Sequence, residues 1–176
     1  MTRFQYGAFI GWILLAAADG LLVSGNLFAG EPPPSKSQID WPKLVGYSRI
    51  KAPVVLLGET PQTYYQKATY DWMGGRFEQL EITLARDPTF KDKYSAEVLT
   101  KEKNPPKELR INDKKAWQWE FPRASRTEVA RRLVVVLDVD KAIIVEQKGD
   151  GANLQDVAKR FDFAKVQKAL ANPPIK

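Results

Sequence analysis

The chain has 176 residues, with 27 Lys and Arg against 21 Asp and Glu, so its formal net charge at pH 7 is +6. It contains no cysteine and no histidine, which excludes thiol nucleophiles, disulfides and imidazole bases and removes the ligands that zinc, copper and haem usually require. The length is sufficient for one domain of ordinary size with a real core.

Residues 1–30 have the features of an export segment. A basic residue, Arg3, precedes the apolar run Ala8–Ala18, and cleavage at the end of this run fits the small-residue rule for signal peptides. The alternative is an uncleaved anchor over residues 6–29 that contacts the membrane, although the carboxylate of Asp19 near its centre disfavours insertion. Both alternatives predict that the domain lies in the periplasm or another extracytoplasmic compartment.

A proline-rich linker at residues 31–40 precedes a single α+β domain at residues 41–176. The linker contains the sequence EPPPSKSQ, a composition that does not form a helix and does not need to pack. We expect the folded part to begin near Trp41 and to continue into a short strand at Ala52–Leu57.

The first clear hairpin flanks the turn Met73–Gly75. Its predicted strands are Thr63–Trp72 and Arg76–Arg86, and on the second strand only the face that carries Glu78, Leu80, Ile82 and Leu84 is clearly apolar. The aromatic residues of this hairpin either pack in the sheet, which we favour, or form a ligand cradle beside the glycines. The residues concerned are Tyr64, Tyr65, Tyr70, Trp72, Gly74 and Gly75.

An amphipathic helix is predicted at residues 88–103. Asp87 and Pro88 are typical of a helix start, and the pair Pro105 and Pro106 follows its end. The apolar residues that recur at helical spacing, and that we expect to cover one face of the sheet, are Phe90, Tyr94, Val98 and Leu99.

A further hairpin is predicted from Lys107 to Phe121, with its turn at Asn112–Lys115. Its second strand places Trp117 and Trp119 on one face. Such a pair either packs in the core, which we favour, or stacks on a ligand such as a sugar or a base.

Basic residues cluster in the sequence around the polar loop Pro122–Glu128. They form a candidate docking patch for an acidic partner, against the alternative of an ordinary solvated loop. The candidate residues are Lys114, Lys115, Arg123, Arg126, Arg131 and Arg132. Charges of both signs are interspersed along the chain, which is typical of a solvated surface. We expect a protein partner and no nucleic acid, and a polyanion binder that uses the basic loop is the weaker alternative.

The stretch Arg131–Lys148 is the longest β signal and predicts the central hairpin. Its first strand is apolar on both faces, which requires a covering layer above and below the sheet. Beyond Gly149–Gly151, helical patterns predict a terminal helical segment at residues 153–171, capped by Asn153 and capped again by Asp162. The predicted architecture is a mainly antiparallel sheet sandwiched by helices.

Catalytic signals are weak throughout. Asp138, Asp140 and Asp150 could supply oxygen ligands to a hard cation, but aspartates at these positions are typical of turns. The spacing of the glutamates selects no acid–base pair, and P-loop, dinucleotide and serine-elbow motifs are absent from the sequence. We therefore expect a non-catalytic protein without a cofactor or metal, with a small-ligand binder or hydrolase as the alternative.

The segments KELRINDKKAWQWEFP, RRLVVVLDVDKAIIVEQ and FDFAKVQKAL, in this order, resemble the PsbP-like superfamily, which includes the bacterial DcrB-like lipoproteins. The resemblance covers residues 50–171. It implies an α/β/α sandwich in an exported accessory or assembly protein that docks on a larger, often membrane-bound, complex. The chain departs from this family because it has no lipobox cysteine and no histidines, so the resemblance does not extend to lipid anchoring or metal binding.

Overall fold

The computed structural model describes residues 39–50, 53–58, 60, 62–74, 77–122, 125, 128–149 and 151–172. The expected export or anchor segment and most of the expected linker lie outside these residues. Ile39 belongs to the hydrophobic core, so packing begins inside the range expected for the linker. None of the helices in the described ranges combines the length and apolar character that a membrane crossing requires.

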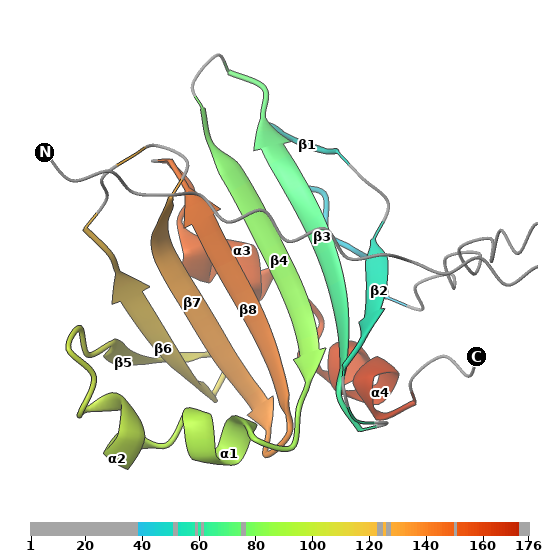
Figure 1. Cartoon of the computed structure of the whole chain (residues 1–176). Helices are drawn as coiled ribbons and strands as arrows, with labels where there is room; N and C mark the ends of the chain where they lie inside the picture. The colour runs from blue at the N-terminus through green and yellow to red at the C-terminus, as the bar shows by residue number, and fades with distance from the viewer. Residues whose placement is uncertain are drawn as a thin grey trace, which may run out of the picture. The chain divides into compact units, whose positions relative to one another are not determined.

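An antiparallel sheet of eight strands forms the centre of the described fold (Figure 1). Seven strands follow the order β1-β3-β4-β8-β7-β6-β5, and β2 also pairs with β3. The strands are β1 (Tyr47–Arg49), β2 (Val54–Leu57), β3 (Tyr64–Trp72), β4 (Gln79–Arg86), β5 (Lys107–Ile111), β6 (Lys114–Glu120), β7 (Val129–Asp138) and β8 (Lys141–Lys148). The mainly antiparallel sheet expected from the sequence is confirmed.

The strands β7 and β8 form the central hairpin, as the sequence predicts. They lie between β6 and β4, so both are interior strands. Their faces bury different clusters, with Leu133 and Val135 in the larger core and Val134 in the smaller one. The alternation that the sequence shows on both faces therefore corresponds to two packed surfaces.

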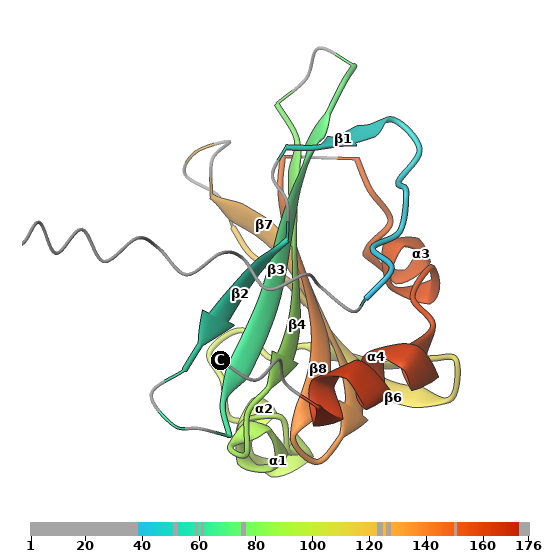
Figure 2. The ribbon, with the colours of Figure 1, turned by 90° about the vertical axis from the view of Figure 1, so that its right-hand side faces the viewer.

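Helices contact both faces of the sheet. The helices α3 (Leu154–Lys159) and α4 (Phe163–Ala171) lie together on one face, as Figure 2 shows, and bury apolar side chains in the larger core. On the other face, α1 (Phe90–Lys93) and α2 (Ala96–Leu99) contribute Phe90 and Leu99 to the smaller core. Asn153 and Asp162 cap α3 and α4 with their side chains, as expected.

The single helix expected at residues 88–103 is wrong, because the chain forms two helices of one turn each. Ser95 separates them with an extended backbone (φ −74°, ψ 144°), and its side chain accepts a hydrogen bond from the Val98 N–H. A short polar side chain such as serine is favoured at an N-cap, where it accepts a backbone N–H, and is less favoured inside a helix. Val98, expected on the buried face, is exposed.

Candidate functional site

Trp117 and Trp119 are core residues and do not form an exposed stacking surface. They are only 3% and 4% exposed and pack in the smaller core against α1 and α2. The Trp119 indole N–H donates to the Glu102 carboxylate at 2.8 Å, whereas the Trp117 indole N–H has no acceptor among the described residues. The core interpretation that the sequence favoured is confirmed, and this strand offers no binding site for a sugar or base.

The four described members of the candidate docking patch do not gather on one surface. In the pairing of β6 with β7, Trp119 lies opposite Arg132 and Glu120 lies opposite Arg131. Because successive side chains on a strand point to opposite faces, Lys115 and Arg132 lie on one face of the sheet and Lys114 and Arg131 on the other. Arg123 and Arg126 lie outside the described residues.

Three of these cations also have contacts within the domain. The Lys114 ammonium donates to the Leu137 carbonyl at 3.0 Å. Lys115 lies over the Trp117 ring and 3.3 Å from Glu108, and Arg132 binds Glu146 at 2.6 Å. The four candidate residues in the described part of the chain therefore do not form a single basic patch.

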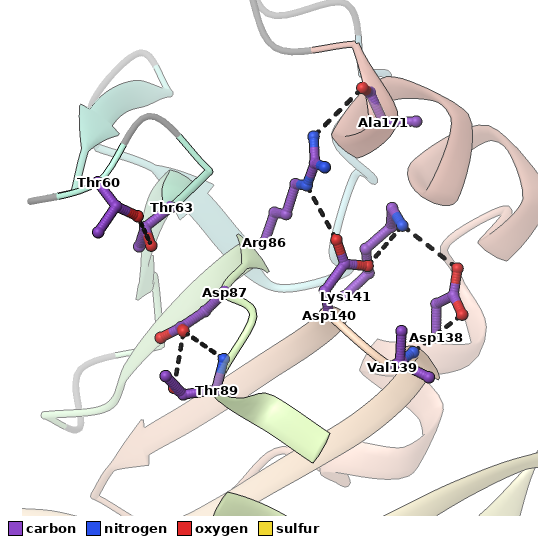
Figure 3. A network of polar contacts seen from close by, with 10 residues as sticks. All are labelled: Thr60, Thr63, Arg86, Asp87, Thr89, Asp138, Val139, Asp140, Lys141 and Ala171. Carbon is purple, nitrogen blue, oxygen red and sulfur yellow. Dashed lines mark hydrogen bonds and ion pairs between the residues drawn. The ribbon is translucent and has the colours of Figure 1, made fainter. Parts of the chain in front are cut away.

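Asp138 and Asp140, the candidate cation ligands, surround the ammonium of Lys141 at the turn between β7 and β8 (Figure 3). Asp140 also accepts from Arg86 at 2.9 Å. Asp150 lies outside the described residues, and within the described ranges no three His, Cys, Asp or Glu side chains gather into a metal-binding group. Two protein cations neutralise these carboxylates, which agrees with the turn interpretation.

The ion pairs among Asp138, Asp140 and Lys141 shift the pKa values of all three groups. Burial alone would raise the pKa of Asp140, but hydrogen bonds and charges from Lys141 and Arg86 outweigh it and hold that pKa below its ordinary value. The Val139 N–H and Lys141 likewise lower the pKa of Asp138. Burial would lower the pKa of Lys141, but the two aspartates raise it above its ordinary value. All three groups are therefore stabilised in their charged forms.

A cavity of about 480 Å³ lies where the β3–β4 hairpin meets the segments before β1 and α3. Its walls come from four separate stretches of the chain. They are Val45, Tyr47, Trp72, Gly74, Glu78, Gly151 and Ala152. Its volume lies within the range of typical small-ligand pockets.

Glu78 is the only ionisable carboxyl side chain among the described residues that line this cavity, and it is 5% exposed. Its Oε1 atom accepts hydrogen bonds from the Tyr47 hydroxyl, from Gln147 Nε2 at 3.0 Å and from the Ala152 N–H at 2.8 Å. Its Oε2 atom accepts no hydrogen bond from the described part of the chain. The carboxylate is thus held in a fixed orientation by one oxygen while the other is left available.

Gly151 leaves the space that Oε2 requires. A Cβ atom at this position would lie 2.0 Å from Glu78 Oε2, which is far closer than van der Waals contact allows. The absence of a side chain at Gly151 therefore allows the carboxylate to pack close to the backbone at this position.

A second acceptor beside Glu78 also has no partner. Gln147 is fully buried, and its Nε2 end must face Glu78 because only this end of the amide can donate to a carboxylate. Its Oε1 atom consequently points elsewhere and has no donor among the described residues. Buried acceptors without donors are uncommon. Gln147 is not among the described residues that line the cavity, so this atom lies in the interior of the domain.

Two aromatic rings line the same cavity as Glu78. Tyr47 and Trp72 meet edge to face, with ring centroids 5.1 Å apart and planes at 66°. Gly46, at φ +82°, allows the Trp72 ring to pack on the backbone, since a Cβ there would lie 2.0 Å from the ring. Of the aromatic cradle weighed in the sequence, Trp72 and Gly74 line this cavity, while Tyr64 and Tyr70 are buried in the core.

A smaller cavity of about 390 Å³ adjoins the first and shares Tyr47 with it. Its lining includes Lys43, Arg49 and Tyr70, and the Tyr70 hydroxyl donates to the Pro42 carbonyl at 3.1 Å. Burial raises the pKa of Tyr70 above its ordinary value, although Arg49 opposes this effect. The two cavities therefore differ in charge, with cations beside one and the Glu78 carboxylate in the other.

No family model matches the chain, and no curated protein or solved structure is significantly similar to it. The function must therefore be argued from the geometry of the site itself.

The sequence pattern around Glu78 marks it as a residue of interest, although its spacing from other glutamates does not. Glu78 directly precedes β4 and continues the alternation of Leu80 and Ile82, so it is a buried carboxylate at a core position. A charged residue at a core position is unusual unless it has partners, which makes it a candidate by itself. The partners Tyr47, Gln147 and Ala152 are distant in sequence and could not be identified from spacing.

Proposed function

We propose that this chain is a non-catalytic, extracytoplasmic binding domain that docks on a protein partner, as an accessory or assembly factor of a larger complex. The observation that carries the proposal is a set of exposed apolar side chains on the chain segments that line the Glu78 cavity. This set, which we call the apolar rim, consists of Val45, Trp72, Met73 and Phe77, which are 81%, 37%, 69% and 47% exposed.

The rim favours a protein over a small ligand. Val45 and Trp72 line the cavity, whereas Met73 and Phe77 do not line it and are next to the lining residues Trp72, Gly74 and Glu78 in the sequence, at the connection between β3 and β4. A ligand confined to the cavity would leave Met73 and Phe77 in water, but a protein surface can cover the cavity and both side chains together. Contiguous exposed apolar residues are typical of interaction sites.

The environment of Glu78 supports binding rather than catalysis. Catalysis by carboxyl groups often uses a pair of them in different environments, and Glu78 has no second carboxyl group beside it among the described lining residues. Three fixed donors hold its charge in place.

Export and the accessory role rest on the sequence. The apolar segment at residues 1–30 supports transfer out of the cytoplasm, and the resemblance of residues 50–171 to the PsbP-like superfamily supports docking on a larger, membrane-bound complex.

Site-specific photo-crosslinking in the native cell tests this proposal. We expect a crosslinking residue at Met73 to give a discrete adduct with one extracytoplasmic protein, and the adduct to decrease when Phe77 is also changed to Ser. The control is a crosslinking residue at Val98, which is equally apolar and 47% exposed but lies on α2.

Three results would contradict the proposal. They are equal adducts from Met73 and Val98, an adduct that Phe77→Ser leaves unchanged, and an adduct with a cytoplasmic protein. The last of these would contradict export in particular.

The second candidate is a small-ligand binder, which the cavity itself favours because its volume is sufficient for one. In this case the cavity at Glu78, and not the buried Trp117 and Trp119, is the binding site. A ligand that binds there without any Met73 adduct in cells would favour this candidate.

A further inference from the structure

We infer that the Glu78 cavity receives a cationic side chain, arginine or lysine, from the docked protein. This inference rests on the proposed function and names the chemistry of its partner. The cavity combines a buried carboxylate, an available acceptor oxygen on that carboxylate and an aromatic wall, and each of these features selects the same kind of group.

The first feature is the available oxygen of Glu78. The carboxylate is almost fully buried, and no ion pair joins it to a cation of the described residues. A buried charge without a counter-charge is unfavourable, and the three hydrogen bonds to Oε1 offset this cost only in part. An N–H group of a cation that reaches Oε2 would supply both the missing donor and the missing charge.

The second feature is that the carboxylate of Glu78 can only accept hydrogen bonds. The three donors that it has among the described residues all bind Oε1, which leaves Oε2 as the acceptor for a ligand. An ammonium or guanidinium carries only donors, whereas a carboxylate or phosphate would add further acceptors. An anionic ligand is therefore disfavoured at this position.

The third feature is the aromatic wall. Tyr47 and Trp72 lie in the same cavity as Glu78, and aromatic faces attract ammonium and guanidinium groups. The aliphatic part of a lysine or arginine side chain would also pack against the apolar rim at the mouth of the cavity.

The charge of the whole chain argues for a local interaction. A net charge of +6 does not attract cations over long distances, and Lys43 and Arg49 line the adjoining cavity. The affinity for a cation must therefore come from short-range contact with Glu78, so removing that one charge should remove most of it.

An NMR titration of the 15N-labelled full chain tests this inference with defined probes. N-acetyl-arginine amide and N-acetyl-lysine amide represent the side chains, and N-acetyl-citrulline amide is a neutral isostere of the arginine probe. The signals to follow are the Trp72 indole N–H and the backbone N–H groups of Gly151 and Ala152. We expect both cationic probes to shift these signals saturably and the citrulline probe to bind at least about tenfold more weakly.

The matched variants are Glu78→Gln and Glu81→Gln. Glu78→Gln keeps an oxygen acceptor but removes the charge, and we expect it to weaken binding of the arginine probe by about tenfold or more. Glu81 lies on the opposite face of β4 in an ion pair with Lys67, so Glu81→Gln should leave binding unchanged. Dispersed amide spectra establish that each variant is folded.

The outcomes separate this inference from the proposed function. Equal binding of the citrulline probe, an unchanged affinity in Glu78→Gln or no shift at the three signals would overturn the inference. If the Met73 adduct nevertheless forms and persists in Glu78→Gln, docking at the rim stands and only the cationic contact fails. If the cationic probes bind but no Met73 adduct forms, the result favours a free small cation as the ligand of the cavity and contradicts a side chain of a protein docked at the rim.

Discussion

At Glu78, one carboxylate oxygen joins β1, β8 and the segment before α3 through three hydrogen bonds. This residue therefore has a structural contribution that is distinct from its available oxygen. The two contributions can be separated, because glutamine retains an acceptor oxygen whereas leucine does not.

We expect Glu78→Leu to lower the free energy of unfolding by about 3 kcal/mol or more, because it leaves several buried donors unsatisfied. Glu78→Gln should cost clearly less. Chemical denaturation measures both values. The control is Glu81→Leu, which removes a partly exposed ion pair with Lys67 and should cost no more than about 1 kcal/mol. Equal losses from Glu78→Leu and Glu81→Leu would contradict the structural role of Glu78.

The sequence could indicate Glu78 as a carboxylate in a core register, but not the cavity around it. Hydrophobic alternation predicts which face of β4 is buried, because side chains alternate strictly along a strand. It does not predict which distant segments cover that face, since the donors come from Tyr47, Gln147 and Ala152. The strand β1 was not predicted at all, because three residues are too few to show a period.

Among the elements, the hairpins were the most predictable and the helix after β4 the least. The strands β7 and β8 carry apolar residues on both faces, and this pattern is compatible only with an interior position. The turn between β5 and β6 uses Asn112 and Asp113 at positive φ, which these residue types tolerate. In contrast, the helical periodicity of the apolar residues extends across Ser95 and predicted one helix. It does not show that the Ser95 side chain caps a new helix at this position.

The central hairpin predicts a large difference between two substitutions of the same type. Val135 on β7 is fully buried, whereas Val139 at the hairpin turn is 66% exposed. Val135→Asp should therefore lower the free energy of unfolding by several kcal/mol, enough to unfold a domain of ordinary stability, because it buries an unpaired carboxylate. Val139→Asp should change it by no more than about 0.5 kcal/mol. Thermal melting of both variants is the measurement, and a wild-type-like melt of Val135→Asp would contradict the interior position of β7.

The turn of the same hairpin predicts how stability depends on pH. The pKa values of Asp138 and Asp140 are lower in the folded chain than their ordinary values. In the acid range the unfolded chain thus binds more protons, so the contribution of these groups is complete above about pH 4 and is lost as pH falls through the folded pKa values.

Urea denaturation between about pH 2 and pH 6 measures this dependence. We expect Asp140→Asn to flatten the rise of stability with pH, because it removes one of the carboxylates that binds Lys141 and Arg86. Asp113→Asn, an exposed substitution on the turn between β5 and β6, controls for the loss of one negative charge. An Asp140→Asn profile that is parallel to that of the parent chain would show that this pairing does not stabilise the fold.

For the molecule as a whole, composition and periodicity predicted the antiparallel sheet and the helices at the C-terminal end of the chain. They did not predict how much of each face of the sheet the helices cover. The face with α3 and α4 carries the larger core. The other face is partly covered by one-turn helices and also carries ion pairs such as Lys67–Glu81 and Arg132–Glu146. Polar residues that alternate with apolar ones on β4 already indicated this difference between the faces.

The hydrogen bonds of Glu78 also affect the order in which the chain can fold. Its donors lie 31, 69 and 74 positions away in sequence, so the cavity is complete only after β1, β8 and the segment before α3 have reached their final places. Contacts of such long sequence separation form late, because loop closure must first overcome chain entropy. The apolar rim around the β3–β4 hairpin, by contrast, is largely local and can form early. A partner that requires Glu78 as well as the rim would thus discriminate between finished and unfinished chains, and its binding would in turn stabilise only the finished fold.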